Sequence, residues 1–175
     1  AVAKGASQEV LLARSGISLA ELEDQDNRIP MSKYVDLTRA AKDLTGDQAI
    51  AQHFGEDVDL AELSITGLIM NASETMGAAF VQMNRFGKLA IEVEGIGVGV
   101  DRFKPAITET GLWLVDTRIN ANDTPELTEM TFARLTCHPR RFLKRPHVLE
   151  VHVTHPAPSY QAEYDRIFRC PVVFE

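Results

Sequence analysis

The histidines are the first residues to consider for chemistry, because an imidazole group can act as an acid, a base or a metal ligand near neutral pH. They are His53, His138, His147, His152 and His155. The last three lie within one expected strand and its exit. At about 3.3 Å per residue, His147 and His155 are too far apart to bind one ion, and His152 is expected on the opposite face. We therefore interpret the histidines as structural or surface residues, and expect no metal site and no triad.

The two cysteines, Cys137 and Cys170, give no stronger signal for a metal or a disulfide. Neither belongs to a CxxC pair, and Cys137 is followed by His138 without a further ligand at zinc-finger spacing. Two cysteines in a chain long enough to build a core do not suggest a disulfide framework. The sequence predicts two buried thiols and no metal or other cofactor.

The common signatures of enzymes are also missing from the sequence, including the GxSxG elbow, the HExxH pair and the phosphate-binding loop. A GxGxG stretch spans residues 95–99, but a strand is expected after it, whereas the dinucleotide fingerprint needs a helix there. The acidic residues between Asp43 and Asp59 lack calcium-loop spacing and are interpreted as a solvated face. We predict that the protein is not an enzyme.

The composition is that of a globular chain, with 45% hydrophobic and 25% charged residues in 175. One domain over residues 1–175 is therefore expected. The longest apolar runs fall far below the roughly 18 residues that a membrane helix requires. The N-terminus lacks the apolar core of a signal peptide. We expect a cytoplasmic protein with no membrane partner.

The formal net charge of -7 argues against direct binding of nucleic acid by this chain, because phosphate binding needs a basic face. One local exception is the basic run from His138 to Arg145, at the expected end of a helix. Cations at that position complement the helix dipole. The run is therefore interpreted as a helix end rather than a DNA or phosphate contact.

Periodicity and capping residues indicate a mixture of helices and strands. Helical spacing between capping residues predicts helices over residues 7–15, 32–46, 73–87, 125–141 and 158–168. Alternation predicts strands over residues 89–94, 98–100, 112–115, 147–154 and 171–174, the first three as an antiparallel meander. Residues 17–29 are expected to connect helices, and residues 60–70 fit helix or strand equally well. The fold class is α+β, with a helical N-terminal half packed on a small, mostly antiparallel sheet and two further helices.

Apolar side chains are the remaining candidates for a functional site. Those expected to line a cavity between helices and sheet are Met70, Met76, Phe80, Met83, Phe86, Trp113 and Phe132. Methionine adapts well to lipophilic ligands. The alternative is that a stripe at helical spacing simply belongs to the core, and this alternative is favoured for any one of these residues taken singly.

The C-terminal sequence THPAPSYQAEYDRIFRCPVVF, residues 154–174, resembles the end of the arabinose-binding N-terminal domain of AraC-type regulators. In that family HPxP, EY, F and CPVxF recur in this order. Shorter pieces agree, namely residues 12–17 (LARSGI), 28–30 (RIP), Tyr34, 44–47 (LTGD) and 63–67. The likeness covers almost the whole chain.

The resemblance implies the effector-sensing domain of a bacterial transcription regulator. Such a domain would bind a small lipophilic or carboxylate-bearing effector and form a homodimer. It would act on DNA only through a C-terminal pair of helix-turn-helix units, which is expected to lie outside residues 1–175. The family name does not fix arabinose as the effector, because fold and family do not determine the ligand.

Two other hypotheses remain open. An interaction or dimerisation module without a small-molecule ligand would expose an apolar patch and show a mass that depends on concentration. An enzyme would need titratable groups that converge in a cleft, for instance around Glu150 and His152.

Overall fold

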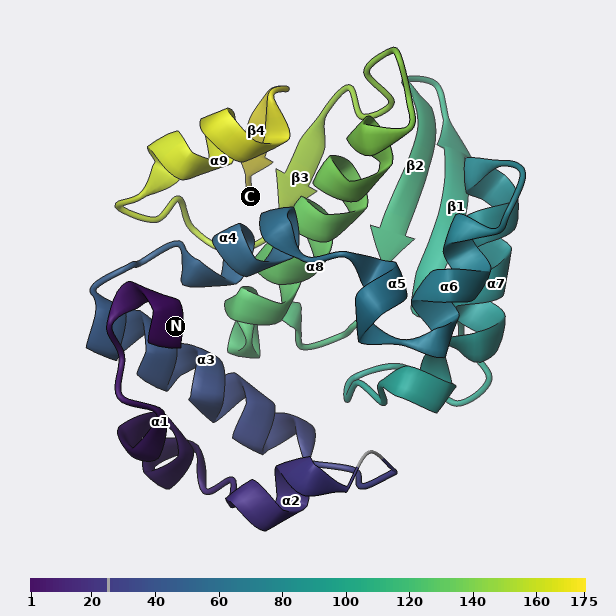
Figure 1. The fold of residues 1–175 in the computed structure, drawn as a ribbon. Helices are drawn as coiled ribbons and strands as arrows, with labels where there is room; N and C mark the ends of the chain where they lie inside the picture. Colours follow the sequence, from purple (N-terminus) through teal and green to yellow (C-terminus); the bar gives the residue numbers. More distant parts are fainter. Residues whose placement is uncertain (25) are drawn as a thin grey trace. The chain divides into compact units, whose positions relative to one another are not determined.

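The computed structural model describes residues 1–24 and 26–175, and these confirm the α+β class (Figure 1). The chain divides into two compact units. Unit 1 consists of residues 1–57 and 122–175, and unit 2 consists of residues 58–121. The expectation of one domain over residues 1–175 stays a prediction.

The first part of unit 1 is helical. It contains η1 (Val2–Lys4), α1 (Gln8–Ser15), α2 (Leu19–Glu23), α3 (Met31–Thr45) and α4 (Ile50–Asp57). The Ser7 side chain accepts a hydrogen bond from Val10 N and so begins α1, while Gly46 ends α3 with φ 69. Glycine adopts this left-handed conformation without strain. The helices expected over residues 7–15 and 32–46 are thereby confirmed.

One short helix in this part was not expected. The acidic segment of residues 17–29 contains α2, which begins with a capping box between Ser18 and Glu21. In a capping box, each side chain bonds the backbone N–H of the other residue. The pattern Ser-x-x-Glu is visible in the sequence and predicts this start.

α1 packs against α3 (Figure 1). The first apolar core lies here and consists of Ala6, Leu11, Ala40, Ala41 and Ile50, with Leu37 packed against it. Small side chains on α3 allow the two helices to approach closely.

The second part of unit 1 alternates helices and strands. It contains η2 (Ala121–Asp123), α8 (Pro125–Cys137), η3 (His138–Arg141), β3 (Val151–Val153), α9 (Gln161–Phe168) and β4 (Val172–Phe174). β3 and β4 are parallel, with Val151 opposite Val172. Parallel neighbours need a crossover connection, which α9 provides. The expected helices and the closing strand are confirmed, while β3 is shorter than the strand predicted over residues 147–154.

α8 is the central helix of unit 1 and packs against α3, α4 and α9. Buried residues occur on most of its sides, and they include Leu127, Glu129 and Ala133. Gly55 on α4 permits a close approach, because a Cβ atom there would lie 2.2 Å from the carbonyl oxygen of Met130. A helix buried in this way must satisfy its polar side chains inside the protein.

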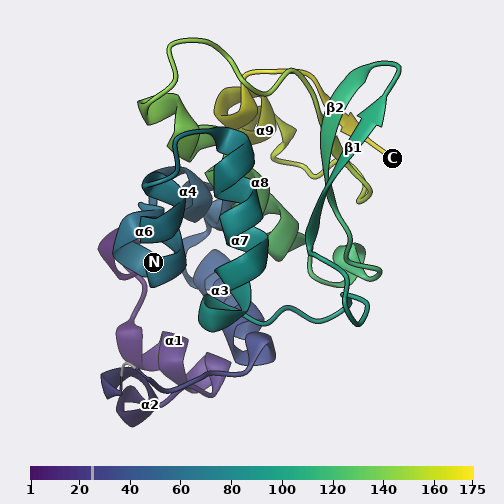
Figure 2. The same cartoon turned by 90° about the vertical axis from the view of Figure 1, so that its right-hand side faces the viewer.

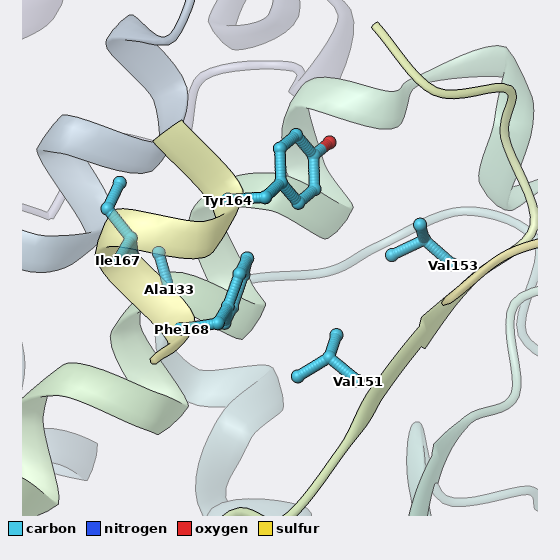
Figure 3. Packing of buried hydrophobic residues seen from close by; sticks show 6 residues of the cluster. All are labelled: Ala133, Val151, Val153, Tyr164, Ile167 and Phe168. Carbon is cyan, nitrogen blue, oxygen red and sulfur yellow. The ribbon is translucent and has the colours of Figure 1, made fainter. Parts of the chain in front are cut away.

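The second apolar core joins α8, α9 and β3 (Figure 3). Tyr164 and Phe168 project from α9 toward Val151 and Val153 of β3, and Ala133 comes from α8. Burying an aromatic side chain such as Phe168 contributes roughly 1.5–3 kcal/mol. The same packing fixes the Tyr164 hydroxyl inside unit 1.

Unit 2 combines short helices with one hairpin (Figure 2). Its elements are α5 (Leu60–Leu63), α6 (Ile65–Asn71), α7 (Met76–Ala90), β1 (Phe103–Thr108) and β2 (Gly111–Asp116). β1 and β2 are antiparallel, with Phe103 opposite Asp116. α6 and α7 lie side by side in both views (Figures 1 and 2). Residues 60–70, which the pattern left open, are therefore helical.

Two of the predicted strands in unit 2 are wrong. α7 continues through Ala90, and the N–H of Ile91 donates to the carbonyl oxygen of Gly87. Alternation over so few residues fits the last turn of an amphipathic helix as well as a strand. Residues 91–102 form turns, with Gly95 and Gly99 at φ 80 and 73. The third expected strand is confirmed as β2, but its partner is β1.

Candidate functional site

Most of the predicted binding residues lie on the α6–α7 pair of unit 2. They are Met70 on α6 and Met76, Phe80, Met83 and Phe86 on α7, and we call these five the Met/Phe face. The α7 positions recur every three or four residues and therefore share one side of that helix. Thr75, rather than the expected Ser73, begins α7 by accepting a hydrogen bond from Ala78 N.

Side-chain hydrogen bonds connect the Met/Phe face to its neighbours. The Thr66 hydroxyl of α6 donates to the carbonyl oxygen of Phe86 at 3.1 Å. The Asn84 amide of α7 donates to the carbonyl oxygen of Phe103 at 2.7 Å, and the N–H of Phe103 donates back to Asn84 Oδ1 at 3.3 Å. α6, α7 and the start of β1 are therefore joined through polar contacts within unit 2.

Trp113 and Phe132 lie on elements other than α6 and α7. Trp113 lies opposite Ala106 on β1, and alternation places it on the other side of the hairpin from Phe103. Its indole N–H points to the hydroxyl groups of Thr108 and Thr110, both at 3.1 Å. Phe132 lies on α8 of unit 1. A common site for all seven residues stays a prediction.

Phe132 has its own packing partners. It lies against the apolar core of unit 1 that contains Tyr164, Ile167 and Phe168. This contact gives Phe132 a role in the core.

The Met/Phe face keeps accessible apolar surface, because all five of its side chains are only half-buried. Within residues 58–121, the described apolar side chains that are fully buried are Ala79 and Phe103. Side chains of a finished core are generally buried more completely than this. The Met/Phe face therefore differs from a fully buried core in its exposure.

Two arginines close to the hairpin share one carboxylate. The Asp116 carboxylate accepts from the guanidinium groups of Arg118 at 3.0 Å and Arg102 at 3.3 Å. The side chains of Asp116 and Arg118 are 6% and 2% exposed. A buried ion pair of this kind needs both partners, because a lone buried charge is costly.

A buried polar cluster in unit 1 was not recognised from the sequence. Glu129 Oε1 on α8 accepts hydrogen bonds from the hydroxyls of Tyr160 at 2.7 Å and Tyr164 at 2.6 Å. His155 Nε2 lies 3.1 Å from the same Tyr164 hydroxyl. Glu129 is only 3% exposed and Tyr164 is fully buried. Gln52 of α4 also lies beside Tyr164, with 0% exposure.

Burial sets the electrostatics of this cluster. It raises the pKa of Glu129, against the hydrogen bonds from the two tyrosines that favour the carboxylate. Burial and the neighbouring Glu129 raise the pKa of Tyr164 in turn. One signal in the sequence was available, since Glu129 stands next to Met130 and four residues before Ala133, in a stretch otherwise interpreted as core.

His53 has a separate position between two carboxylates. Its Nδ1 lies 2.8 Å from Asp47 Oδ2, and its Nε2 lies 2.9 Å from Glu163 Oε2 on α9. Burial alone lowers the pKa of His53, but the hydrogen bonds to Glu163 and Asp47 raise it above the ordinary value. This side chain connects α4 to α9.

The basic run holds helix ends together. The Arg140 guanidinium donates to the carbonyl oxygen of Ile167 at 2.5 Å and to that of Phe168. Arg141 donates to the carbonyl oxygen of Asp57 at 3.2 Å. Carbonyls at the end of a helix lack partners within it, so Arg140 supplies the missing donors for α9.

Among residues 1–24 and 26–175, no group of three or more His, Cys, Asp or Glu side chains could hold a metal ion. In the same residues, no helix is long and apolar enough to cross a membrane. Cys137 and Cys170 are free, half-buried thiols, and burial raises the pKa of both.

Comparison with known families identifies the class of protein. Residues 5–175 match the family described as the arabinose-binding domain of AraC transcription regulator, N-terminal. The chain is thus a regulatory ligand-binding domain, and this family is not an enzyme family. It belongs to the N-terminal domains of AraC-type transcription regulators. A comparison with individually curated proteins found no match.

Proposed function

We propose that this chain senses a small lipophilic effector and controls DNA binding by a C-terminal helix-turn-helix domain. The observation that carries the proposal is the half-buried Met/Phe face in a chain that belongs to the AraC-type sensor family. Flexible methionine side chains next to phenylalanine rings form the kind of surface that accepts apolar ligands.

The effector is proposed to be held by its apolar part rather than by its charge. Arg102 and Arg118 already bond the carboxylate of Asp116. Apolar burial contributes about 25 cal/mol per Å². A ligand with a hydrocarbon chain or ring system therefore fits the available surface best.

Regulation by such an effector requires two states of the domain with unequal affinity for it. A ligand on the Met/Phe face would act on α6 and α7, and the Asn84 contact would transmit a movement of α7 to Phe103. The acidic chain, with net charge -7, suits a sensor that leaves phosphate contacts to another domain. The regulator is proposed to be bacterial, cytoplasmic and homodimeric.

The test uses Trp113, which is the single tryptophan of the chain. Its fluorescence and the melting temperature are recorded while the protein is titrated with medium-chain fatty acids and with the corresponding uncharged alcohols. Saturable binding of both series, with a raised melting temperature, is expected. Weakening by Met83→Gln but not by Ile107→Ser is also expected, because Ile107 lies on the exposed hairpin.

Other results would contradict this proposal. If neither series binds, the lipophilic effector is wrong. If only the fatty acids bind and Met83→Gln has no effect, a charged site elsewhere holds the ligand.

A second candidate function is a protein-interaction or dimerisation module without a small-molecule ligand. The observation that favours it is the hairpin pair Ile107 and Leu112, which lie opposite each other and are 89% and 74% exposed. Large apolar side chains exposed together often mark a contact surface. Sedimentation over a range of concentrations tests it, and Ile107→Lys should then reduce the mass to that of a monomer.

A further inference from the structure

Three polar side chains form a row inside unit 1, in the order His155, Tyr164 and Glu129. The Tyr164 hydroxyl oxygen lies 3.1 Å from His155 Nε2 and 2.6 Å from Glu129 Oε1. All three residues are buried. His155 follows β3, Tyr164 lies on α9 and Glu129 lies on α8. The row therefore joins three elements around the second apolar core.

Hydrogen-bond chemistry fixes the number of protons in this row. His155 Nδ1 lies 3.0 Å from the carbonyl oxygen of Pro156, which can only accept, so Nδ1 carries a hydrogen. One hydrogen is needed for the hydrogen bond between His155 and Tyr164, and a second for the hydrogen bond between Tyr164 and Glu129. The Tyr164 hydroxyl supplies one of them. The other must be on His155 Nε2 or on the Glu129 carboxyl group.

Two arrangements satisfy both hydrogen bonds. In the first, imidazolium His155 donates to the Tyr164 oxygen, and the Tyr164 hydroxyl donates to the Glu129 carboxylate. In the second, a neutral Glu129 carboxylic acid donates to Tyr164, which donates to neutral His155. The second arises from the first when one proton moves from Nε2 to the Tyr164 oxygen and the hydroxyl proton moves to Oε1. Both contain the same number of protons and carry no net charge.

We propose that His155, Tyr164 and Glu129 hold one shared proton, and that its loss at alkaline pH weakens the junction of α8, α9 and the end of β3. After that loss, one hydrogen remains for two hydrogen bonds, so Tyr164 loses either its bond to His155 or its bond to Glu129. The group that is left stays buried with one partner fewer. Unit 1 thus contains a proton-sensitive element, which is independent of any effector.

The direction of the pH dependence follows from the number of protons bound in the folded and unfolded states. In an unfolded chain the ordinary pKa values are about 6.5 for histidine and 4.3 for glutamate, so neither side chain holds this proton at pH 8. The folded row retains it, and burial raises the pKa of Glu129 in the same direction. Folding therefore takes up one proton above pH 7. The stability that the row contributes is therefore fully present between the unfolded glutamate and histidine values of about 4.3 and 6.5, and it falls as the pH rises above the histidine value.

Few other charges face the row. From α3, Lys42 Nζ lies 5.1 Å from the centre of the Tyr160 ring. From α8, Glu126 is close enough to Tyr160 to raise the pKa of its hydroxyl, after the larger effects of burial and Glu129. Near Tyr160, the positive charge of Lys42 and the negative charge of Glu126 therefore have opposite electrostatic effects.

The remaining elements contribute neutral groups. α4 brings the neutral amide of Gln52 beside Tyr164. β4 brings Phe174, whose ring centre lies 5.1 Å from that of Tyr164 and 5.9 Å from that of His155. Gln52 and Phe174 are thus neutral neighbours of Tyr164 that do not titrate.

The first experiment measures the unfolding equilibrium of the protein by denaturant between about pH 6 and pH 9. The background variant His53→Gln/His152→Gln removes two other histidines whose pKa is raised in the folded protein. A decrease of the folding constant that approaches tenfold per pH unit is expected above pH 7. Glu129→Gln should abolish this dependence, because a glutamine amide is neutral and carries no proton that titrates in this range.

Tyr160→Phe is the matched control. It removes one hydrogen bond to Glu129 but leaves the row complete, so the protein should be less stable at every pH with the same slope. A slope that is unchanged in Glu129→Gln would overturn the proposal.

A second measurement needs no variant and remains decisive if Glu129→Gln does not fold. Nuclear magnetic resonance follows the His155 ring nitrogens and the Glu129 carboxyl carbon through the same pH range. Both groups should change at one common pH, while Nδ1 keeps its hydrogen. Two separate titrations, at ordinary values for each residue, would show that no proton is shared.

Discussion

The Asn84 side chain forms two hydrogen bonds with the backbone of one residue, Phe103, donating to its carbonyl oxygen at 2.7 Å and accepting from its N–H at 3.3 Å. Asn84 lies on α7 next to Met83, and Phe103 is the first residue of β1. The hairpin is thereby fastened to the helix that carries most of the Met/Phe face.

Asn84→Ala is expected to loosen this attachment. The change leaves the N–H and carbonyl of Phe103 without their partner, which costs roughly 1–3 kcal/mol of unfolding free energy. Denaturant unfolding followed by Trp113 fluorescence measures it. Gln82→Ala, at a half-buried position on the same helix, is the control and should change stability by less than about 0.5 kcal/mol. Equal effects of the two variants would contradict a specific role of Asn84.

His53→Gln is expected to destabilise the protein more at pH 5.5 than at pH 8.5. The pKa of His53 is raised in the folded state by Glu163 and Asp47, so its contribution is complete below the unfolded value of about 6.5. That contribution is lost as the pH rises through the folded value. We expect a loss of about 1 kcal/mol on the acid side. Urea unfolding at the two pH values measures the difference.

The two carboxylates beside His53 set the lower pH limit of the range in which His53 stabilises the protein. The pKa values of Asp47 and Glu163 are both lowered in the folded state by hydrogen bonds that include those from His53. Their contribution is present above the ordinary carboxyl values and is lost as the pH falls through the lowered ones. The control is Lys144→Gln, at an exposed position outside these ion pairs. A larger effect of His53→Gln at pH 8.5 than at pH 5.5 would show that the imidazolium bridge is wrong.

Gly55→Ala is expected to destabilise unit 1. The new Cβ atom would lie 2.2 Å from the carbonyl oxygen of Met130, so α4 and α8 would have to separate. Overpacking of this kind typically costs 1–3 kcal/mol, here expected at about 2 kcal/mol or more. Thermal unfolding measures the loss.

Gly87→Ala provides the opposite control. No atom lies within 4 Å of a Cβ at Gly87, and the residue is inside α7. Alanine is favoured over glycine in a helix by about 1 kcal/mol, so this variant should be equally or more stable. If both glycine variants behaved alike, close packing of α4 on α8 would not be the cause.

Arg140→Met is expected to weaken the end of α9, because the carbonyl oxygens of Ile167 and Phe168 lose their charged donor. Hydrogen bonds to a charged group contribute about 1.5–3 kcal/mol. Lys144→Gln, in the exposed part of the basic run, should change stability little. Chemical denaturation of both variants separates the structural role of Arg140 from a general effect of positive charge. Similar losses of stability in both variants would indicate a general effect of positive charge.

Local signals predicted much of the fold. Ser7, Gly46 and the sequence Thr124-Pro125 each mark a helix end through a mechanism that acts within a few residues. The same reasoning failed over residues 89–94, where a short alternation follows a helix without a break. Gly87 predicted a stop, but the last turn of α7 continues past it.

The candidate site was predictable only in part, for a related reason. Spacing shows which side chains share one side of a helix, and it placed Met76, Phe80 and Met83 together. It does not show which elements meet, so the grouping of Phe132 with them stays a prediction, while Phe132 packs against the core of unit 1. The contact of Glu129 with Tyr164 could not be predicted for the same reason, because only folding brings α8 and α9 together.

The parallel pairing of β3 with β4 has a consequence for motion. Val151 N donates to Pro171 O, and Glu175 N donates to Val153 O. Because α9 connects the two strands, these hydrogen bonds depend on α9 remaining folded. Strands this short gain little from pairing alone. The amide hydrogens of Val151 and Glu175 should therefore exchange with solvent in the same opening event as those of α9. This segment would open and close as one cooperative foldon, at a free energy below that of global unfolding.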